Sequence, residues 1–268
     1  MNRKFSITIT GLALAATLGL AGCGGSSSTS TSSAAASGGA SSAQAADAAS
    51  SPSATPTPET PTATVLYPKM KAAVKTATSA HVKATDVSGS KETYEVTGNQ
   101  AGTNATLSIA SPTKGKAQVL IVGTKGYLKG DATYWKAVGA PTAAASKLIG
   151  KWVAVPASKM SSLGEVGIKN IADSTFKNDP TSAQLAKGTV TAADLDGVKA
   201  WKITGFDGTS GSSLWVAADG EPYPLRVANT KASTGTRSTE DVRFDQWNSA
   251  PKAVAPAASE IAATPGQG

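Results

Sequence analysis

The sequence predicts an α+β domain in which a large antiparallel sheet carries about three helices on one side. Apolar and polar residues alternate with a period of two through most of residues 65–251, which is typical of strands with one buried face. Gly-containing turn signals separate these segments, at Gly89, at 113–115 and at three Asp-Gly pairs. Only three segments have a helical pattern, so we expect an antiparallel sheet to dominate the domain.

Six strand candidates show the alternation most clearly, with apolar residues on one face and polar residues on the other. They are 80–87 (AHVKATDV), 105–110 (ATLSIA), 200–205 (AWKITG), 213–217 (SLWVA), 224–229 (PLRVAN) and 241–247 (DVRFDQW). A seventh segment, 117–123 (AQVLIVG), is apolar at four successive positions, from Val119 to Val122. Both faces of that strand should therefore be covered, one by helices and the other by more protein or by a ligand.

Three helices are expected from apolar stripes. Residues 67–80 (YPKMKAAVKTATSA) place Met70 and Val74 on one stripe, with Pro68 at a first-turn position. The other two helices are predicted over 142–150 (TAAASKLIG) and over 163–174 (LGEVGIKNIADS), the latter with 175–180 as an extension. We expect all three to cover one face of the sheet.

The N-terminus has the layout of an export signal. Arg3 and Lys4 precede an uncharged stretch that ends in Leu-Ala-Gly before Cys23, the single cysteine of the chain. This ending resembles the bacterial lipobox, which implies transfer of diacylglyceryl to the Cys23 thiol and cleavage before it. The alternatives are a buried structural cysteine or a chance cysteine in a plain secretory or membrane-spanning helix. We expect residues 1–22 to be a lipoprotein signal peptide and the exported protein to be anchored by lipid to the outer face of the cell membrane.

Composition divides the rest of the chain into three parts. Residues 23–64 begin with the lipidated cysteine and are mostly Ser, Ala, Thr, Gly and Pro, so they cannot bury a core and predict a disordered tether. Residues 65–251 are long enough for one domain with a substantial core. Residues 252–268 return to Ala and Pro, and we expect this tail to be loose beyond Ile261.

The net charge of +7 at pH 7 belongs to the domain. Residues 1–64 contain two basic and two acidic residues, so residues 65–268 carry the whole excess. On an exported, membrane-tethered protein this charge favours an anionic membrane surface or an anionic headgroup. Nucleic acid is not expected as a partner, because the lysines are scattered and the sequence contains neither a helix-turn-helix pattern nor a basic aromatic cluster.

Catalytic and metal sites have little support in the sequence. His81, the single histidine, alternates outward in a predicted strand, where we expect it to be solvated. Residues 194–197 (DLDG) lack the later ligands of a calcium loop and predict a hairpin turn. Residues 123–131 (GTKGYLKGD) lack the Gly-Lys-Ser/Thr of a phosphate loop. One cysteine allows neither an intramolecular disulfide nor a cysteine-ligated metal site. From these motifs taken together we expect no enzyme, no metal and no cofactor besides the covalent lipid on Cys23.

After the lipobox and the tether, the order of four segments resembles the LolA-like, LppX/LprG-type lipoproteins of the actinobacterial cell envelope. These segments are GYLKGDATYW (126–135), KLIGKWVAVP (147–156), AADGEPYPLRV (217–227) and VRFDQWNSAPKAVAPAASEI (242–261). The resemblance spans about residues 66–261. It implies a strongly curved antiparallel half-barrel packed over helices, with an apolar cavity between them for the acyl chains of a lipid or lipoglycan. It implies no catalytic residues.

Such a cavity would be lined by the inward residues of the strands and by apolar residues of the helices. The candidates are Val82, Leu107, Ile109, Val119, Ile121, Leu148, Ile149, Val166, Ile168, Ile171, Trp201, Ile203, Leu214, Val216, Leu225, Val227, Val242 and Phe244. The alternative for each one is packing into a solid core, because any half-buried sheet shows apolar residues with a period of two.

Polar groups are expected at the mouth of the cavity. The headgroup candidates are Lys83, Lys129, Lys136, Lys151, Lys202, Arg226 and Arg243. The alternative is that they form the solvated faces of strands. Trp135, Trp152 and Trp247 lie near strand ends, where they either line the rim or cap the core with one hydrogen bond each.

Two functions without catalysis remain open. The first is a lipid carrier that takes an amphiphile from the membrane and shields its chains, with a membrane transporter as a candidate partner. The second is an envelope interaction or sensor module that docks a protein or a cell-wall polymer. A carrier needs an empty apolar slot, whereas a docking module needs a closed core and an exposed apolar patch. The doubly apolar segment 119–122 and the helix-rich middle favour the carrier.

Overall fold

The computed structural model describes residues 59–86, 91–156, 159–160, 167–176, 179–207, 211–233 and 236–263 of the 268-residue chain. The predicted signal peptide, Cys23 and most of the predicted tether lie outside these residues, as does the cavity candidate Val166. Residues from Thr60 onward belong to one compact unit, and the described core residues all lie between 63 and 247. Residues 59–268 therefore contain the whole of the described core. No helix in the described ranges is long and apolar enough to cross a membrane.

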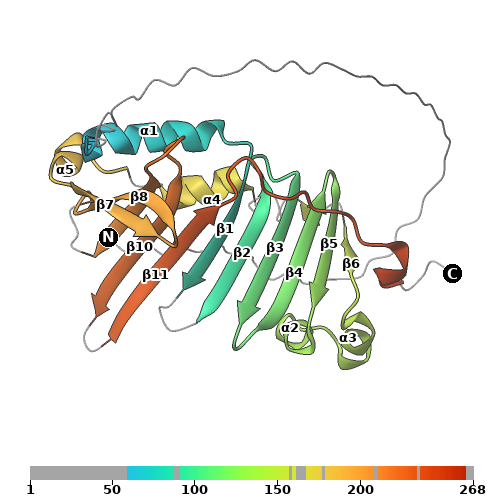
Figure 1. The fold of residues 1–268 in the computed structure, drawn as a ribbon. Coiled ribbons are helices and arrows are strands. Elements are labelled where there is room, and N and C mark those ends of the chain that lie inside the picture. Colours follow the sequence, from blue (N-terminus) through green and yellow to red (C-terminus); the bar gives the residue numbers. More distant parts are fainter. Residues whose placement is uncertain are drawn as a thin grey trace, which may run out of the picture. The chain divides into compact units, whose positions relative to one another are not determined.

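An antiparallel sheet of eleven strands forms the framework of this unit (Figure 1). The strands are β1 (Ser79–Asp86), β2 (Glu92–Asn99), β3 (Asn104–Ser111), β4 (Gly115–Val122), β5 (Lys125–Gly130), β6 (Val153–Val155), β7 (Thr189–Leu195), β8 (Val198–Thr204), β9 (Ser212–Ala217), β10 (Pro224–Ser233) and β11 (Thr236–Asp245). Their order, β6-β5-β4-β3-β2-β1-β11-β10-β9-β8-β7, consists of two meanders that are joined where β1 pairs with β11. The predicted antiparallel sheet is confirmed.

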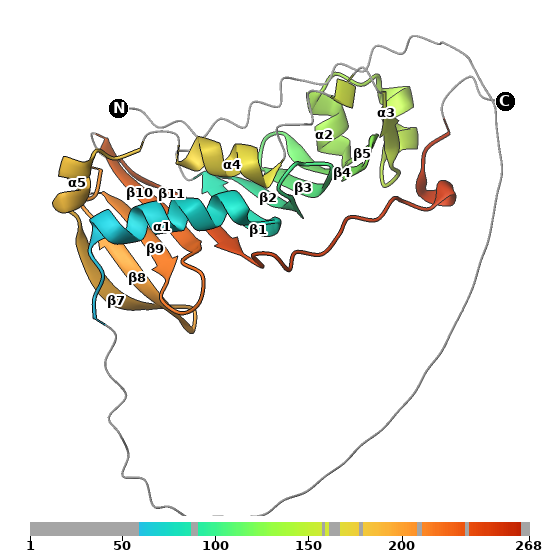
Figure 2. The same cartoon turned by 90° about the horizontal axis from the view of Figure 1, so that it is seen from above.

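Two helices, α1 (Ala63–Thr76) and α4 (Ile168–Thr175), lie side by side over one face of this sheet (Figure 2). We call this face the helix face and the opposite one the outer face. Two short helices, α2 (Ala132–Ala137) and α3 (Thr142–Leu148), connect β5 to β6, and α5 (Ser182–Ala186) precedes β7. The predicted α+β class, with a large antiparallel sheet and few helices, is therefore confirmed.

The first helix begins and ends earlier than the predicted range of 67–80. It starts at Ala63, inside the segment assigned to the tether, because Thr62 is its extended N-cap. It ends at Thr76 because Ala77 turns to an extended ψ of 141°. Pro68 therefore lies inside the helix and not in its first turn. Ser79 and the residues after it pair with β2, which explains why the predicted helical end is a strand.

Two helices were missed because they are too short to show a period. In α2, the Asp131 carboxylate accepts a hydrogen bond from the backbone N–H of Tyr134 at 2.7 Å. In α5, Thr181 and Gln184 form a capping box. Such caps satisfy backbone groups that a short helix leaves unpaired. The predicted helix over 142–150 is confirmed as α3, and the one over 163–174 begins at Ile168 within the described residues.

The core lies on the helix face, where apolar side chains of neighbouring strands stand directly opposite one another. One row crosses six strands from β5 to β11, with Leu128, Val119, Leu107, Val96, Val82 and Phe244. A second row crosses from β11 to β8, with Val242, Val227, Leu214 and Ile203. Each of these side chains contributes roughly 1.5–3 kcal/mol on full burial, so this layer is a main source of stability.

Helix α1 covers this layer because its apolar residues recur at helical spacing. Leu66, Tyr67, Met70 and Val74 are buried, and Met70 is fully enclosed. The side chain of Gln100, just after β2, donates a hydrogen bond to the carbonyl of Val74 at 3.1 Å. The end of α1 is thus attached to the sheet by a hydrogen bond as well as by apolar packing.

The C-terminal segment runs along the outer face of the first meander, in front of the strands in Figure 1. The Asn104 side chain exchanges two hydrogen bonds with the backbone of Ala253, at 3.0 and 2.8 Å. Ile261 forms a parallel bridge with Trp152. The segment predicted as a tail from residue 252 is therefore bonded to the sheet as far as Ile261.

The side chains of residues 119–122 are buried or half-buried on both faces of the sheet. Val119 and Ile121 are buried on the helix face. Leu120 and Val122 are half-buried on the outer face, where Val122 is paired with Asn104 and the C-terminal segment passes. The outer face of this strand is therefore covered by protein, which is one of the two possibilities that the sequence leaves open, the other being a ligand.

A buried carboxylate fixes the start of β2. Glu92 is 8% exposed and accepts hydrogen bonds from the hydroxyls of Tyr94 at 2.6 Å and Ser111 at 3.0 Å. Its carboxylate also pairs with the ammonium of Lys114 at 3.0 Å. The hydrogen bond from Tyr94, followed by those from Lys114 and Ser111, lowers the pKa of Glu92 below its usual 4.5 against the opposing effect of burial.

Replacing Glu92 with Gln should lower the free energy of unfolding at neutral pH by about 1–3 kcal/mol, because buried donors lose a charged acceptor. Since the folded pKa lies below the unfolded one, the contribution of the charge is complete above pH 4.5 and is lost as the pH falls through the folded pKa. Urea unfolding should show a gap between wild type and variant at neutral pH that narrows in acid, as the pH falls below 4.5. The exposed Glu221→Gln should show no such gap. An equal gap at both pH values would contradict the role of the charge.

Candidate functional site

Most of the predicted cavity residues form the packed layer of the helix face. The residues at most 6% exposed are Val82, Leu107, Val119, Ile121, Ile168, Ile171, Ile203, Leu214, Val216, Val227, Val242 and Phe244. Ile109, Leu148 and Trp201 are half-buried and pack against the same cluster. These side chains contact one another closely, as the solid-core alternative expects.

Two predicted cavity residues occupy different environments. Ile149 is 48% exposed, because it is the C-cap that follows α3 and departs from the helical stripe. It is therefore not an inward residue. Leu225 is half-buried at a bulge, where the register of β10 against β9 shifts between Pro224 and Arg226.

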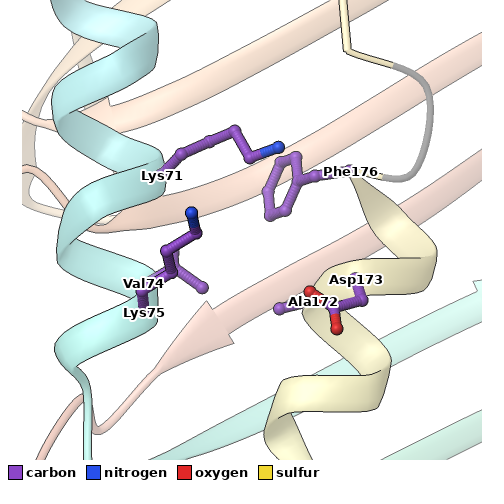
Figure 3. Close-up of a pocket in the computed structure, with 6 residues that line it drawn as sticks. All are labelled: Lys71, Val74, Lys75, Ala172, Asp173 and Phe176. Carbon is purple, nitrogen blue, oxygen red and sulfur yellow. The ribbon is translucent and has the colours of Figure 1, made fainter.

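A pocket of about 270 Å³ opens between α1 and α4 (Figure 3). It is lined by Lys71, Val74 and Lys75 from α1, by Ala172 and Asp173 from α4, and by Phe176 just after α4. Val74, Ala172 and Phe176 are buried and give the pocket an apolar floor. Lys71, Lys75 and Asp173 give it a charged rim, and Figure 3 shows Lys71 extending from α1 towards Phe176. This combination suits an amphiphilic ligand.

Asp179 attaches α1 to the chain beyond α4. Both of its carboxylate oxygens accept from the Lys71 ammonium at 2.6 Å, and Oδ1 also accepts from the Tyr67 hydroxyl at 3.1 Å. We call these contacts of Asp179 the latch. Lys71 and Asp179 are both partly exposed, and exposed ion pairs contribute at most about 1 kcal/mol. The latch is therefore weak enough to open.

A stack of aromatic rings attaches the α4 side of the pocket to the sheet. Ring centroids are 6.2 Å apart for Phe176 and Phe244, 5.9 Å for Phe244 and Trp247, and 4.7 Å for Trp247 and Tyr223. The Trp247 indole also donates to the carbonyl of Pro224 at 3.0 Å. Trp247 thus caps the core with one hydrogen bond, and the stack joins Phe176 to the sheet.

None of the basic residues that were predicted to lie at the mouth of the cavity lines this pocket. One row on the outer face contains Lys83, Arg243, Arg226 and Lys202. Trp215 stands between Arg226 and Lys202, whose cationic groups lie 4.8 and 5.0 Å from its ring centroid. Arg226 and Arg243 also form ion pairs with Asp241. Alternate residues of a strand point to opposite faces, so this row faces away from α1 and α4.

The remaining headgroup candidates lie around the first meander. Lys129 stands over the Trp152 ring at 5.5 Å, and the Lys151 ammonium donates to the carbonyl of Ser259 at 3.1 Å. Lys136 is exposed on α2. Trp135 is buried and donates to the Gly130 carbonyl at 3.1 Å, so it too caps the core with one hydrogen bond.

His81 is held between two carboxylates and is not solvated as predicted. Its side chain is 15% exposed, with Nδ1 2.7 Å from Asp245 and Nε2 2.9 Å from Glu95. The prediction was wrong because β11 and β2, which flank β1, each bring a carboxylate to the same histidine.

Within the described ranges, no cluster of three or more His, Cys, Asp or Glu side chains is arranged to hold a metal ion. Residues 194–197 form the predicted hairpin turn between β7 and β8, with Gly197 N–H donating to Asp194 at 2.7 Å.

The sequence analysis named none of the residues that line the pocket as a cavity or headgroup candidate, and it also missed Asp179 of the latch. The lining residues include Lys71 and Lys75. The available signal was the position of the two lysines, which are one turn apart and flank the buried stripe of α1. The pairing with Asp179 spans 108 residues and has no local signature.

No protein-family model and no curated protein matches the chain. Among solved structures, the chain is similar to LprF from Mycobacterium bovis, with 15% identity, 74% of this chain and 100% of that chain covered, and a TM-score of 0.46. It is also similar to the lipoprotein LppX from Mycobacterium tuberculosis, with 16% identity, 69% and 94% coverage, and a TM-score of 0.38. An uncharacterized conserved protein from Thermus thermophilus matches at 11% identity, 76% and 95% coverage, and a TM-score of 0.34. The solved structures to which the chain is similar thus include LppX, one of the lipoproteins that the sequence resembles.

Proposed function

We propose that this protein is an exported, lipid-anchored lipoprotein that binds the acyl chain of a lipid or lipoglycan and carries or presents it in the cell envelope. The observation that supports it most is the pocket between α1 and α4, with its apolar floor and its lysines at the rim. An amphiphile requires both features, since its chain seeks apolar surface and its headgroup stays in water. The export signal and Cys23 in the sequence support the anchoring part of the proposal.

The size of the pocket implies that loading requires α1 and α4 to separate. Its 270 Å³ is just below the roughly 300–1,000 Å³ of ordinary small-ligand sites. Burying about sixteen methylenes gains on the order of 10 kcal/mol, at roughly 0.8 kcal/mol each. Breaking the Lys71–Asp179 ion pair of the latch costs at most about 1 kcal/mol, and losing the hydrogen bond from Tyr67 costs about 0.5–1.5 kcal/mol more. Most of the gain is therefore left to offset the separation of the two helices.

The direct test is native mass spectrometry of residues 59–268, exported from an actinobacterial host and followed by solvent extraction. Residue 59 is the appropriate start, because α1 begins at Ala63. A stoichiometric mass excess that solvent releases as an acylated lipid would establish the function and identify the ligand. A clean protein mass that persists after incubation with envelope lipids would exclude lipid carriage.

Opening the latch should speed loading. Asp179→Asn removes the charge that holds Lys71 and should raise the rate of uptake of a fluorescent lysophospholipid about two- to five-fold, as expected for loss of an exposed ion pair. Stopped-flow fluorescence measures this rate. Asp196→Asn is the matched control, because it breaks an exposed pair with Arg243. Equal rates for Asp179→Asn and wild type would contradict gating by the latch.

The second candidate is the docking or sensor module. The tight burial of the helix-face layer favours it, because a docking module needs no empty slot. Such a module also needs a contiguous exposed apolar patch. Within the described residues, the large exposed apolar side chains are Val65, Ile149, Val198 and Val254. They belong to α1, to the end of α3, to β8 and to the C-terminal segment, and this dispersal favours the carrier.

A further inference from the structure

The solvent side of α1 is a basic stripe. Its exposed residues include Val65, Pro68, Lys69, Ala72 and Lys75, which lie on the side of the helix opposite the buried stripe. The helix contains three lysines and no acidic residue. It therefore presents positive charge together with small apolar side chains along one line.

Two of these lysines have no neutralising partner in the described structure. Lys71 is paired with Asp179 in the latch, and on α4 Lys169 is paired with Asp173 at 2.6 Å. No carboxylate of the described residues lies within ion-pair distance of the ammonium groups of Lys69 or Lys75. The positive charge of the stripe is thus available to an external anionic partner.

We infer that the exposed stripe of α1 docks on an anionic phospholipid membrane. This inference rests on the proposed function and specifies which face of the protein meets the membrane. Lys75 belongs both to the stripe and to the rim of the pocket, so docking would bring the pocket to the headgroups. An amphiphile could then leave the bilayer and enter between the helices without its chain crossing water.

Charge and connectivity favour a membrane over other anionic partners. A basic residue close to an anionic bilayer strengthens binding by roughly five-fold, so Lys69 and Lys75 together strengthen it by roughly twenty-fold. The chain before α1 leads to Cys23, the proposed site of the lipid anchor, which would keep the stripe near the bilayer. Val65 is large, apolar and 48% exposed, as suits contact with the membrane interface.

The orientation can be tested with single-cysteine probes, because residues 59–268 contain no cysteine. Val65 on α1 and Val198 on β8 are both 48% exposed and form a matched pair. Each is replaced by Cys in residues 59–268 and labelled with a polarity-sensitive fluorophore. Vesicles of phosphatidylcholine with one-third phosphatidylglycerol should shift the emission to the blue at position 65 and not at position 198. A shift at position 198 alone, or at neither position, would overturn the inference.

The charge requirement can be tested with two double variants of equal net charge. Lys69→Gln with Lys75→Gln should weaken binding to the anionic vesicles about twenty-fold, and Lys69→Gln alone about five-fold. Lys83→Gln with Lys202→Gln removes the same charge from the outer face and should weaken binding less than about three-fold. An equal loss for the two double variants would overturn docking by α1, since only overall charge would then matter.

Failure of the docking inference can be distinguished from failure of the proposed function. Uptake of a dispersed, short-chain lysophospholipid does not need a membrane and is measured by native mass spectrometry. A protein that loads this lipid and ignores anionic vesicles would overturn docking and leave the carrier function intact. Capture by an anionic cell-wall polymer, with no binding to vesicles, would overturn the membrane as the occupant of the stripe.

Discussion

Ala172→Phe should weaken lipid binding at least tenfold and leave the protein folded. Ala172 lines the pocket from α4, and its side chain points towards α1 (Figure 3). A phenyl ring at this position would occupy the space that the acyl chain needs. We expect at least a tenfold loss of affinity, about 1.4 kcal/mol or more, with an overpacking cost of about 1–3 kcal/mol in stability. The bound fraction in native mass spectra and a thermal unfolding curve measure the two effects.

Ser174→Phe is the matched control for this variant. Ser174 is exposed on the same helix and is not among the residues that line the pocket. The same aromatic ring placed there should leave lipid binding unchanged. Ala172→Leu adds a smaller side chain and provides a second test if the phenyl ring prevents folding. Stoichiometric lipid in a folded Ala172→Phe protein would show that the ligand does not use this pocket.

The strands could be predicted because their signals are local. Alternation places Val82 and Phe244 on the buried face, and the structure pairs these two residues directly. The pairing of β1 with β11, which joins the two meanders, has no local signal, because 164 positions separate His81 from its partner Asp245. The surroundings of a strand residue depend on which strands flank it, and this is why the environment of His81 was predicted wrongly.

The pocket could not be predicted for a related reason. Its walls come from Lys71 and Val74 on α1, from Ala172 on α4 and from Phe176 just after α4, about one hundred positions away along the chain. Each helix taken alone shows an apolar stripe, which is typical of any helix that covers a sheet. Whether two such helices touch or leave a gap depends on the size of the side chains between them, and periodicity does not contain this information.

The headgroup candidates on the outer face show again that a local sequence pattern does not determine how distant elements pack. Period-two alternation correctly predicts that Lys202 and Arg226 lie on the polar side of their strands. A lysine on the polar face of a sheet and a lysine at the rim of a pocket have the same local pattern. The choice between them depends on which face the helices cover, which only the packing of α1 and α4 determines.

Leu214→Ala should have the largest effect on stability among single substitutions in the second row of the core. Leu214 is fully buried on β9, where it stands between Ile203 of β8 and Val227 of β10. Removing a leucine side chain from a packed core costs about 2–5 kcal/mol, through lost transfer free energy and the cavity left behind. Urea unfolding of residues 59–268 measures the loss as a lower midpoint with an unchanged slope.

Two control variants show whether side chains fill the space around Leu214 or leave room there for an acyl chain. Val198→Ala removes an exposed side chain and should change stability by less than about 0.5 kcal/mol. Trp215→Ala, one position beyond Leu214 on the outer face, should lose mainly its contacts with Lys202 and Arg226, at about 0.5–1 kcal/mol each. A cost for Leu214→Ala close to that of Val198→Ala would mean that few atoms pack around Leu214. The acyl chain would then have space beneath the helices without their separation, and Asp179→Asn would no longer be expected to speed loading.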